Sequence, residues 1–236
     1  MPWKHVGLAL MALLTLAAGA AMVAVADPET GKTLEVTLGK AIDRNWDEVK
    51  ADKYAYGPKQ DYDADKKEIH IYLPYGNDGS YFEVSGVNFT DPGSESGCPL
   101  ARTPDGNTSL KLVYKLHFDK PVKSFRMSVG WTELGLAEGA VGGVEYSTDG
   151  QKWSTVNEVS KGGIVEPLVK DDKSFDLPKG ARDLYIRFYS RDKANPDSGS
   201  GPSRWMKFRM AGDPSWGDAS STFFQVQVQV WATAAE

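Results

Sequence analysis

The sequence predicts an all-β protein, an antiparallel two-sheet β-sandwich of the jelly-roll type with an irregular N-terminal extension. The first observation is a hairpin signal at 144–159, where Asp149-Gly150 separates two alternating runs and tolerates the positive φ of a tight turn. The second is a series of short alternating segments, separated by loops rich in Pro, Gly and Ser. The third is the lack of βαβ alternation and of an internal repeat, which argues against the parallel α/β and propeller classes.

Each expected strand is a run in which apolar side chains recur at every second position. The clearest run is 222–231, where Val228 and Val230 share one face and Gln229 and Trp231 share the other. In chain order, strands are expected at 34–38, 68–73, 81–89, 110–118, 122–131, both arms of 144–159, 164–165, 174–177, 184–189, 205–210 and 222–231. The polar stretches 54–65 and 90–107 are expected as loops.

The N-terminus has the pattern of a targeting segment. Lys4 and His5 precede an apolar stretch at 6–23, and Ala24-Val25-Ala26 offers a small-x-small cleavage site. The pattern predicts a signal peptide at 1–26 and a secreted, periplasmic or cell-envelope location; an uncleaved anchor is the alternative. We expect the extension to occupy 27–66 and the β-sandwich domain to occupy 67–236, with no membrane span in the mature chain.

Charge and cysteine usage narrow the class of protein. The chain of 236 residues has a net charge of −5, which argues against a nucleic-acid partner, because such a partner calls for a basic surface. Cys98 is the single cysteine, so an internal disulfide is impossible and the core must stabilise the fold. The simplest interpretation of Cys98 is an unpaired thiol in a loop.

Two segments carry a family resemblance. VEYSTDGQKW at 144–153 resembles the hairpin of galactose-binding-like β-sandwiches, which are the discoidin (factor 5/8 type C) domains and related carbohydrate-binding modules. ARDLYIRF at 181–188 resembles a later strand of the same family, so the resemblance covers roughly the second half of the chain. It implies a non-catalytic carbohydrate-binding module with a glycan or glycoconjugate partner, and it allows a structural calcium ion. In that family the hairpin is scaffold, so Asp149, Gly150 and Trp153 are expected as turn and core.

The ligand-binding candidates are tryptophans next to charged residues in or beside loops, because aromatic faces stack on sugar C–H surfaces while polar groups read the hydroxyls. Trp216 is the first candidate, although a tryptophan in such a loop is equally suited to closing one end of a sandwich. For Trp131 and Trp205 a core role is the favoured alternative. The full candidate set is Trp216, Asp213, Asp218, Trp205, Arg204, Trp131 and Glu133.

Two other classes of function stay open. An envelope-associated or adhesion protein would bind another extracellular protein through the sandwich surface, and an exposed apolar patch would mark it. A glycoside-acting enzyme would need two positioned carboxylates, and no spacing singles out a pair among Glu133, Glu138, Glu145 and Glu166. The sequence therefore favours a protein that is not an enzyme.

The sequence contains no complete metal-binding motif of the EF-hand or histidine-rich type. Asp61-x-Asp63-x-Asp65 resembles the start of an EF-hand loop, but Lys66 and Tyr72 replace the required glycine and glutamate. A solvated loop is the favoured interpretation, and a different calcium geometry is the alternative. The mature chain has only two histidines, which disfavours a histidine-rich metal site.

Overall fold

The computed structural model describes residues 30–41, 59–73, 81–90, 100–102, 109–130, 132–136, 138–195, 203–208 and 228–235. For 59, 88–90, 100–102, 133 and 203–208 it describes the backbone alone. Within these residues the regular elements are strands arranged in three sheets, without a helix, which confirms the all-β sandwich class.

The strands pair antiparallel with one exception, the parallel pair of β1 and β7. Sheet A contains, in spatial order, β1 (Leu34–Val36), β7 (Leu110–Phe118), β14 (Asp183–Asp192), β10 (Ala140–Ser147) and β11 (Ser154–Val159), and β4 (Glu83–Ser85) also pairs with β7. Sheet B contains β13 (Phe175–Asp176), β8 (Val122–Val129), β16 (Val228–Ala234), β3 (Glu68–Tyr72) and β2 (Lys59–Asp63). Sheet C contains β12 (Gly163–Val165), β9 (Thr132–Leu136), β15 (Ser203–Phe208), β6 (Leu100–Arg102) and β5 (Asn88–Thr90).

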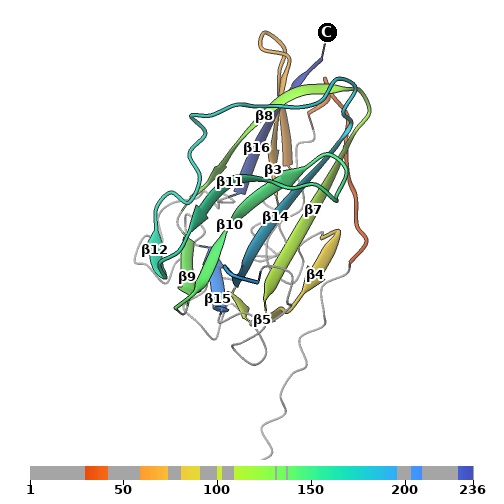
Figure 1. The fold of residues 1–236 in the computed structure, drawn as a ribbon. Helices are drawn as coiled ribbons and strands as arrows, with labels where there is room; N and C mark the ends of the chain where they lie inside the picture. The colour runs from red at the N-terminus through yellow and green to blue at the C-terminus, as the bar shows by residue number, and fades with distance from the viewer. Residues whose placement is uncertain are drawn as a thin grey trace, which may run out of the picture.

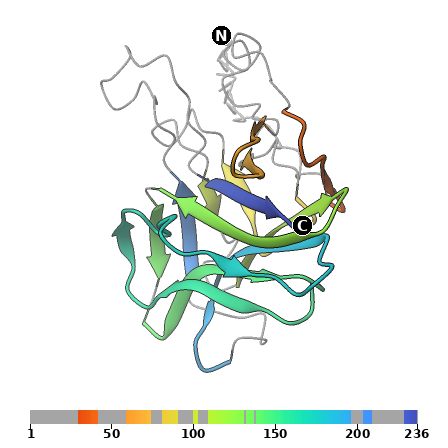
Figure 2. The same cartoon turned by 90° about the horizontal axis from the view of Figure 1, so that it is seen from above.

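Sheet A forms one layer of the sandwich, and sheets B and C lie behind it in Figure 1. The view from above in Figure 2 shows the same two layers edge-on. Phe125 of sheet B packs edge-to-face against Tyr146 of sheet A, with ring centroids 5.0 Å apart. Leu134 and Leu136 of sheet C reach Gly142 of sheet A, where an added Cβ would lie 3.2 Å from the nearer leucine. Both rear sheets therefore share the core with sheet A.

The predicted alternation becomes the core of the sandwich. On β7, Leu112, Tyr114 and Leu116 are completely buried between the two layers, while Lys111 and Lys115 lie on the opposite face. On β16, the expected inward residues Val228, Val230 and Ala232 are buried as well. Each large apolar side chain of this kind stabilises the fold by about 1.5–3 kcal/mol.

The predicted hairpin is present as β10 and β11, but its loop spans six residues rather than a two-residue turn. Asp149 organises the loop because its Oδ1 accepts the backbone N–H groups of Gln151 and Lys152, both at 2.8 Å. These bonds hold the pKa of the Asp149 carboxyl below its usual value. Gly150 has φ +71°, as the Asp-Gly signal requires. The loop is therefore a scaffold element.

Several loops and strands differ from expectation. The run 81–89 forms two strands, β4 and β5, which belong to different sheets and are separated by Gly86 at φ +65°. The expected loops 54–65 and 90–107 contain β2 and β6, and β9 was not expected at all. On β2 the buried position is held by Gln60, a polar residue, so the apolar alternation that marks a strand is missing.

Part of the segment 27–66, expected as an irregular extension, is built into the sheets. β1 pairs with β7, and β2 pairs with β3. Leu34, Val36 and Leu38 are buried in the common core. Two pieces of the expected extension are therefore strands of the sandwich.

The signal segment 1–26 and Cys98 lie outside the described residues, so secretion and the state of the thiol stay predictions. In the parts of the chain that the structure describes, there is no helix with the length and apolar character needed to cross a membrane.

Candidate ligand-binding site

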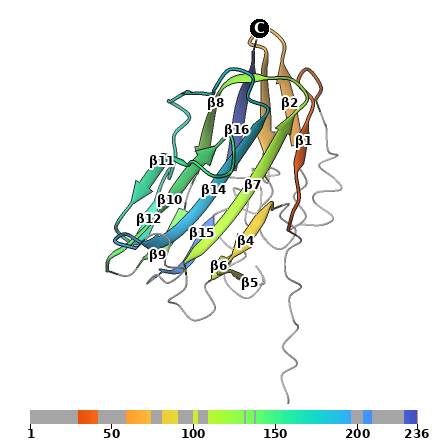
Figure 3. The same cartoon turned by 45° about the vertical axis from the view of Figure 1, so that its right-hand side comes forward.

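The structure describes three of the seven residues predicted to bind ligand, by their backbone. Trp131, Asp213, Trp216 and Asp218 lie outside the described residues. The remaining three belong to sheet C, where Arg204 and Trp205 are on β15 and Glu133 is on β9. β9 and β15 are neighbours in that sheet (Figure 3).

Backbone pairing relates these three positions. Trp205 is opposite Gly135, and Lys207 is opposite Glu133. The register shifts between Ser203 and Trp205, which makes Arg204 the extra residue of a β-bulge. Because paired residues share a face of a pleated sheet, Trp205 and Glu133 occupy the same face of sheet C.

That face is the one turned away from the core. Leu134, which alternates with Glu133 and Gly135 on β9, is buried in the core. Ile164 on the edge strand β12 pairs with Glu133 and is 62% exposed. We call the face the sheet C outer face; its positions are Ile164, Glu133, Gly135, Lys207, Trp205, Leu100 and Arg102.

A second tryptophan, Trp231 on sheet B, is excluded as a sugar platform. The Arg126 guanidinium lies 4.2 Å from the centre of its ring, and the His70 ring stacks on it with centroids 4.2 Å apart and planes 16° apart. Ion pairs with Glu68 at 2.8 Å and Asp171 at 3.0 Å fix Arg126. With neighbours stacked on Trp231 in this way, it stabilises the outside of sheet B instead of offering a free surface.

His70 makes the stability of this stack depend on pH. Burial lowers the pKa of His70 below its ordinary value of 6.5, although the hydrogen bond to Gln229 at 2.8 Å opposes the shift. At a pH above 6.5 His70 is mostly neutral in both the folded and the unfolded protein. As the pH falls below 6.5, the His70 side chain of the unfolded chain is protonated before that of the folded protein, which favours unfolding. We therefore expect the free energy of unfolding to fall as the pH drops from about 7 to about 5.

The measurement is urea denaturation across that range for the wild type and for His70→Phe, which keeps a ring against Trp231 but cannot titrate. The variant should lose part of the slope. The other titrating groups, including His117 and the carboxyl groups of Asp63 and Asp149 with their lowered pKa, are present in both proteins, so the difference isolates His70. Parallel pH curves would contradict the assignment.

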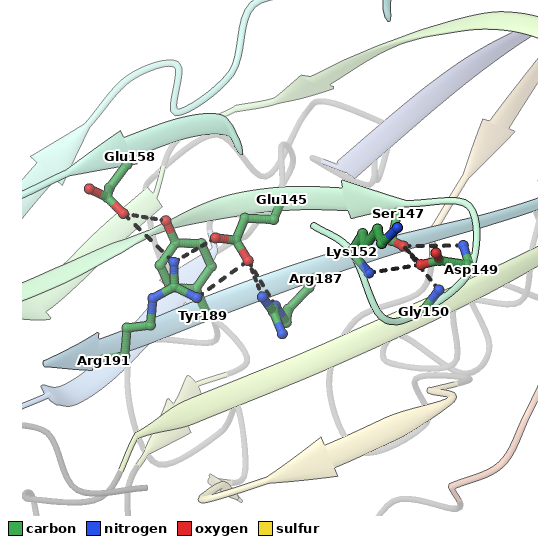
Figure 4. Close-up of polar contacts among 9 residues, drawn as sticks. All are labelled: Glu145, Ser147, Asp149, Gly150, Lys152, Glu158, Arg187, Tyr189 and Arg191. Atoms are coloured by element: carbon green, nitrogen blue, oxygen red, sulfur yellow. Dashed lines mark hydrogen bonds and ion pairs between the residues drawn. The ribbon is translucent and has the colours of Figure 1, made fainter. Parts of the chain in front are cut away.

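The outside of sheet A carries a charge network centred on Glu145 (Figure 4). The Glu145 side chain is 5% exposed, and its Oε2 accepts Nε of Arg187 at 2.9 Å while its Oε1 accepts Nη2 of Arg191 at 2.6 Å. The two guanidinium groups in turn cover aromatic rings, Arg187 over Trp153 at 3.9 Å and Arg191 over Tyr189 at 4.0 Å. Trp153 is therefore half-buried beneath an arginine.

The second carboxylate of the network, that of Glu158, is hydrogen-bonded to a tyrosine. Tyr189 donates its hydroxyl to Oε2 of Glu158 at 2.7 Å, and Arg191 lies 4.0 Å from the same carboxylate. Burial, followed by this hydrogen bond, raises the pKa of Tyr189 far above its usual value, so the phenol stays protonated. Tyr189 is 2% exposed. A substrate has no access to the phenol, and both Glu145 oxygens are bound, so this network braces the sheet and does not supply a nucleophile.

The sequence offers Glu145 as one of several candidate carboxylates, but it does not predict which charged side chains contact it. Its arginines are 42 and 46 residues away in the chain. Strand alternation on 184–189 places Tyr185, Arg187 and Tyr189 on one face, but it does not say which strand lies beside them. That neighbour is set by the register of β10 on β14, which aligns Glu145 with Arg187.

No group of three or more His, Cys, Asp or Glu side chains among the described residues is arranged to hold a metal ion. Asp63 of the Asp61-x-Asp63-x-Asp65 pattern instead caps a turn, because its Oδ1 accepts the N–H groups of Asp65 and Lys66, both at 3.1 Å. Its other oxygen pairs with the Lys66 ammonium at 3.0 Å. Asp61 lies two residues earlier, on β2, where it pairs with His70 of β3.

Comparison with known proteins gives no family. No known protein family and no curated protein matches the chain. The solved structure of TmCBM61 in complex with beta-1,4-galactotriose overlaps 53% of this chain and 80% of that chain, at 13% identity and a TM-score of 0.31. The Drosophila melanogaster CENP-C cupin domain overlaps 72% of this chain and 99% of that chain, at 14% identity and a TM-score of 0.13. TM-scores this low carry no conclusion about fold or function.

Proposed function

We propose that the chain is a secreted, non-catalytic carbohydrate-binding protein whose binding surface is the sheet C outer face. The observation that carries this proposal is the register of β9 and β15, which aligns Trp205 with Gly135 and Glu133 with Lys207 on the face away from the core. A tryptophan position is thus surrounded by positions of both charges, which is the chemistry that recognises the C–H faces and hydroxyls of a sugar.

The shape of the surface favours an extended glycan. The position opposite Trp205 is Gly135, which adds no side chain of its own to this face. The adjacent strands β6 and β12 continue the face on both sides, with Arg102 opposite Trp205 and Ile164 opposite Glu133. Five strands side by side span about 19 Å, which is enough for several sugar units. We therefore infer that the ligand is an oligosaccharide or the glycan of a glycoconjugate.

A non-catalytic role fits the contacts of the two carboxylates in the network on the outside of sheet A. Glu145 is bound by two arginines, and Glu158 accepts the hydrogen bond from Tyr189. Neither is available as a general acid beside a sugar. Secretion rests on the apolar segment and cleavage pattern of residues 1–26.

The test is a glycan array probed with the chain from Asp27 onward, as wild type and as Trp205→Ala. We expect specific binding that falls about tenfold or more in the variant while circular dichroism is unchanged. Trp231→Phe is the matched control, because Trp231 is stacked between Arg126 and His70 and its replacement should leave binding intact. Binding that survives Trp205→Ala, or no binding to any glycan, would overturn the proposal.

A Trp216→Ala variant separates two locations for the site. If Trp216→Ala abolishes binding and Trp205→Ala does not, the surface is the loop 212–221 and the sheet C assignment is wrong. A repeat with chelator tests the calcium ion that the family resemblance allows, because a required ion would make binding sensitive to its removal.

The alternative is a protein-binding envelope or adhesion role. Its sign would be a contiguous exposed apolar patch. Among the described residues, the two exposed large apolar side chains are Phe82 near sheet A and Ile164 on sheet C. They belong to different layers and do not form one patch, which is why we favour the glycan.

A further inference from the structure

A pocket of about 240 Å³ opens at the side of the sandwich, between the edge strand β11 of sheet A and the chain that leads into β13 of sheet B. None of the residues that line it belongs to the sheet C outer face. In Figure 1 this chain climbs along the edge of the molecule from β12 beside β8 and β11. The pocket therefore lies at the edge of the sandwich, where β11 meets the segment 167–175.

Backbone hydrogen bonds hold both walls of the pocket in place. Val129 and Val169 exchange two N–H···O bonds of 3.0 and 3.1 Å, and Leu168 donates to the carbonyl of Gly130 at 3.1 Å. From the sheet A side, Nδ2 of Asn157 on β11 donates to the carbonyl of Leu168 at 2.6 Å. Because the walls are tied to both sheets and to each other, the pocket is formed before a ligand arrives.

The wall chemistry combines an apolar surface with an aromatic ring. Val156, Pro167 and Phe175 line the pocket together with the buried Leu168 and Val169. Phe175 is supported from within by Phe125, with ring centroids 5.2 Å apart and planes 25° apart. A surface of this kind suits the C–H face of a small ring.

The polar side chains at the pocket have a net positive charge. Asn157, Lys170, Asp172 and Lys173 are all part of the lining. Asp171, which lies between Lys170 and Asp172 in sequence, is not part of the lining and forms an ion pair with Arg126 at 3.0 Å. Among the described residues, no ion pair engages Lys170 or Lys173. Two ammonium groups against one carboxylate favour an anionic ligand.

We propose that this pocket binds a single sugar residue that carries a carboxylate, such as a uronic acid. Lys170 and Lys173 hold the carboxylate, Asn157 and Asp172 read the hydroxyls, and the wall around Phe175 contacts the C–H face of the ring. The volume is smaller than the roughly 300–1,000 Å³ of pockets for drug-sized ligands, so it suits one ring and not a chain. The site is independent of the sheet C outer face.

The experiment is calorimetric titration of the chain from Asp27 onward with three probes. Glucuronate has the ring, the hydroxyls and the carboxylate; glucose lacks the carboxylate; cyclohexanecarboxylate lacks the hydroxyls. We expect glucuronate to bind about tenfold or more tightly than either analogue, with an affinity that falls as salt is added. Equal affinity for glucose, or no binding of glucuronate at all, would overturn the proposal.

A double variant tests whether glucuronate binds in this pocket. Lys170→Met with Lys173→Met keeps both apolar stems and removes both charges, so glucuronate affinity should fall about tenfold or more. Lys161→Met with Lys179→Met removes the same charge from exposed lysines that do not line the pocket, and should leave the affinity unchanged. Equal losses in the two double variants would show that glucuronate responds to net charge only, and would overturn the proposal. A Trp205→Ala variant should bind glucuronate normally, which separates this site from the proposed glycan surface.

Discussion

Glu145→Gln should destabilise the protein by about 3 kcal/mol, because removing one partner of a buried ion pair leaves the other charges uncompensated. Glu145 is nearly inaccessible, and the side chains of Arg187 and Arg191 are 17% and 21% exposed. Glutamine retains the shape and one hydrogen-bond acceptor, so the loss reports the charge. Urea denaturation monitored by tryptophan fluorescence measures it as a lower midpoint at unchanged slope.

Glu158→Gln is the matched control for this prediction. It is the same substitution on the neighbouring strand, but the Glu158 side chain is 34% exposed and lies 4.0 Å from Arg191. Glutamine still accepts the hydrogen bond from Tyr189, so we expect a cost below about 1 kcal/mol. Similar losses in both variants would mean that Glu145 is not the centre of the network.

Phe188→Ala should cost about 3–5 kcal/mol, because it leaves a cavity in the middle of the core. Phe188 is completely buried on β14, which lies between β7 and β10, and its ring packs edge-to-face on Tyr114 with centroids 6.1 Å apart. The free energy of unfolding from denaturant titration gives the cost directly. A loss of this size is a large part of the stability of a typical domain.

Ile164→Ala serves as the comparison for Phe188→Ala. It also truncates a large apolar side chain on a strand, but that side chain is 62% exposed. The expected change is within about 0.5 kcal/mol. A cost at Ile164 comparable to that at Phe188 would show that the outer position of β12 is covered in solution.

Local sequence patterns were sufficient to predict many of the strands. Alternation predicted β7 and β8 at 110–118 and 122–131, and the Asp-Gly signal predicted the pairing of β10 with β11. It failed where the inward position is polar, as at Gln60 on β2, and where one run is divided between two sheets, as at Gly86. In both cases the outcome depends on neighbouring strands that are remote in sequence, and a local pattern does not contain them.

The candidate site was predictable only in part. Proximity of aromatic and charged residues in sequence pointed to Arg204, Trp205 and Glu133, and the structure places them on neighbouring strands. The network of Glu145, Arg187 and Arg191 and the side pocket with Lys170 and Lys173 depend on which strand edges meet. A single sequence does not contain that information in any local window, because register between distant strands is a property of the packed sheet.

The position of β16 within sheet B governs the order in which the molecule can assemble. β16 pairs with β3 on one side and with β8 on the other, although β3 precedes it by more than 150 residues. Until residues 228–234 emerge from the ribosome, sheet B consists of two separate halves with unpaired inner edges. Such edges attract other chains, and closing so long a loop is slow. The finished sheet is thus secured by β16, which follows every other described strand of the sheet in the chain.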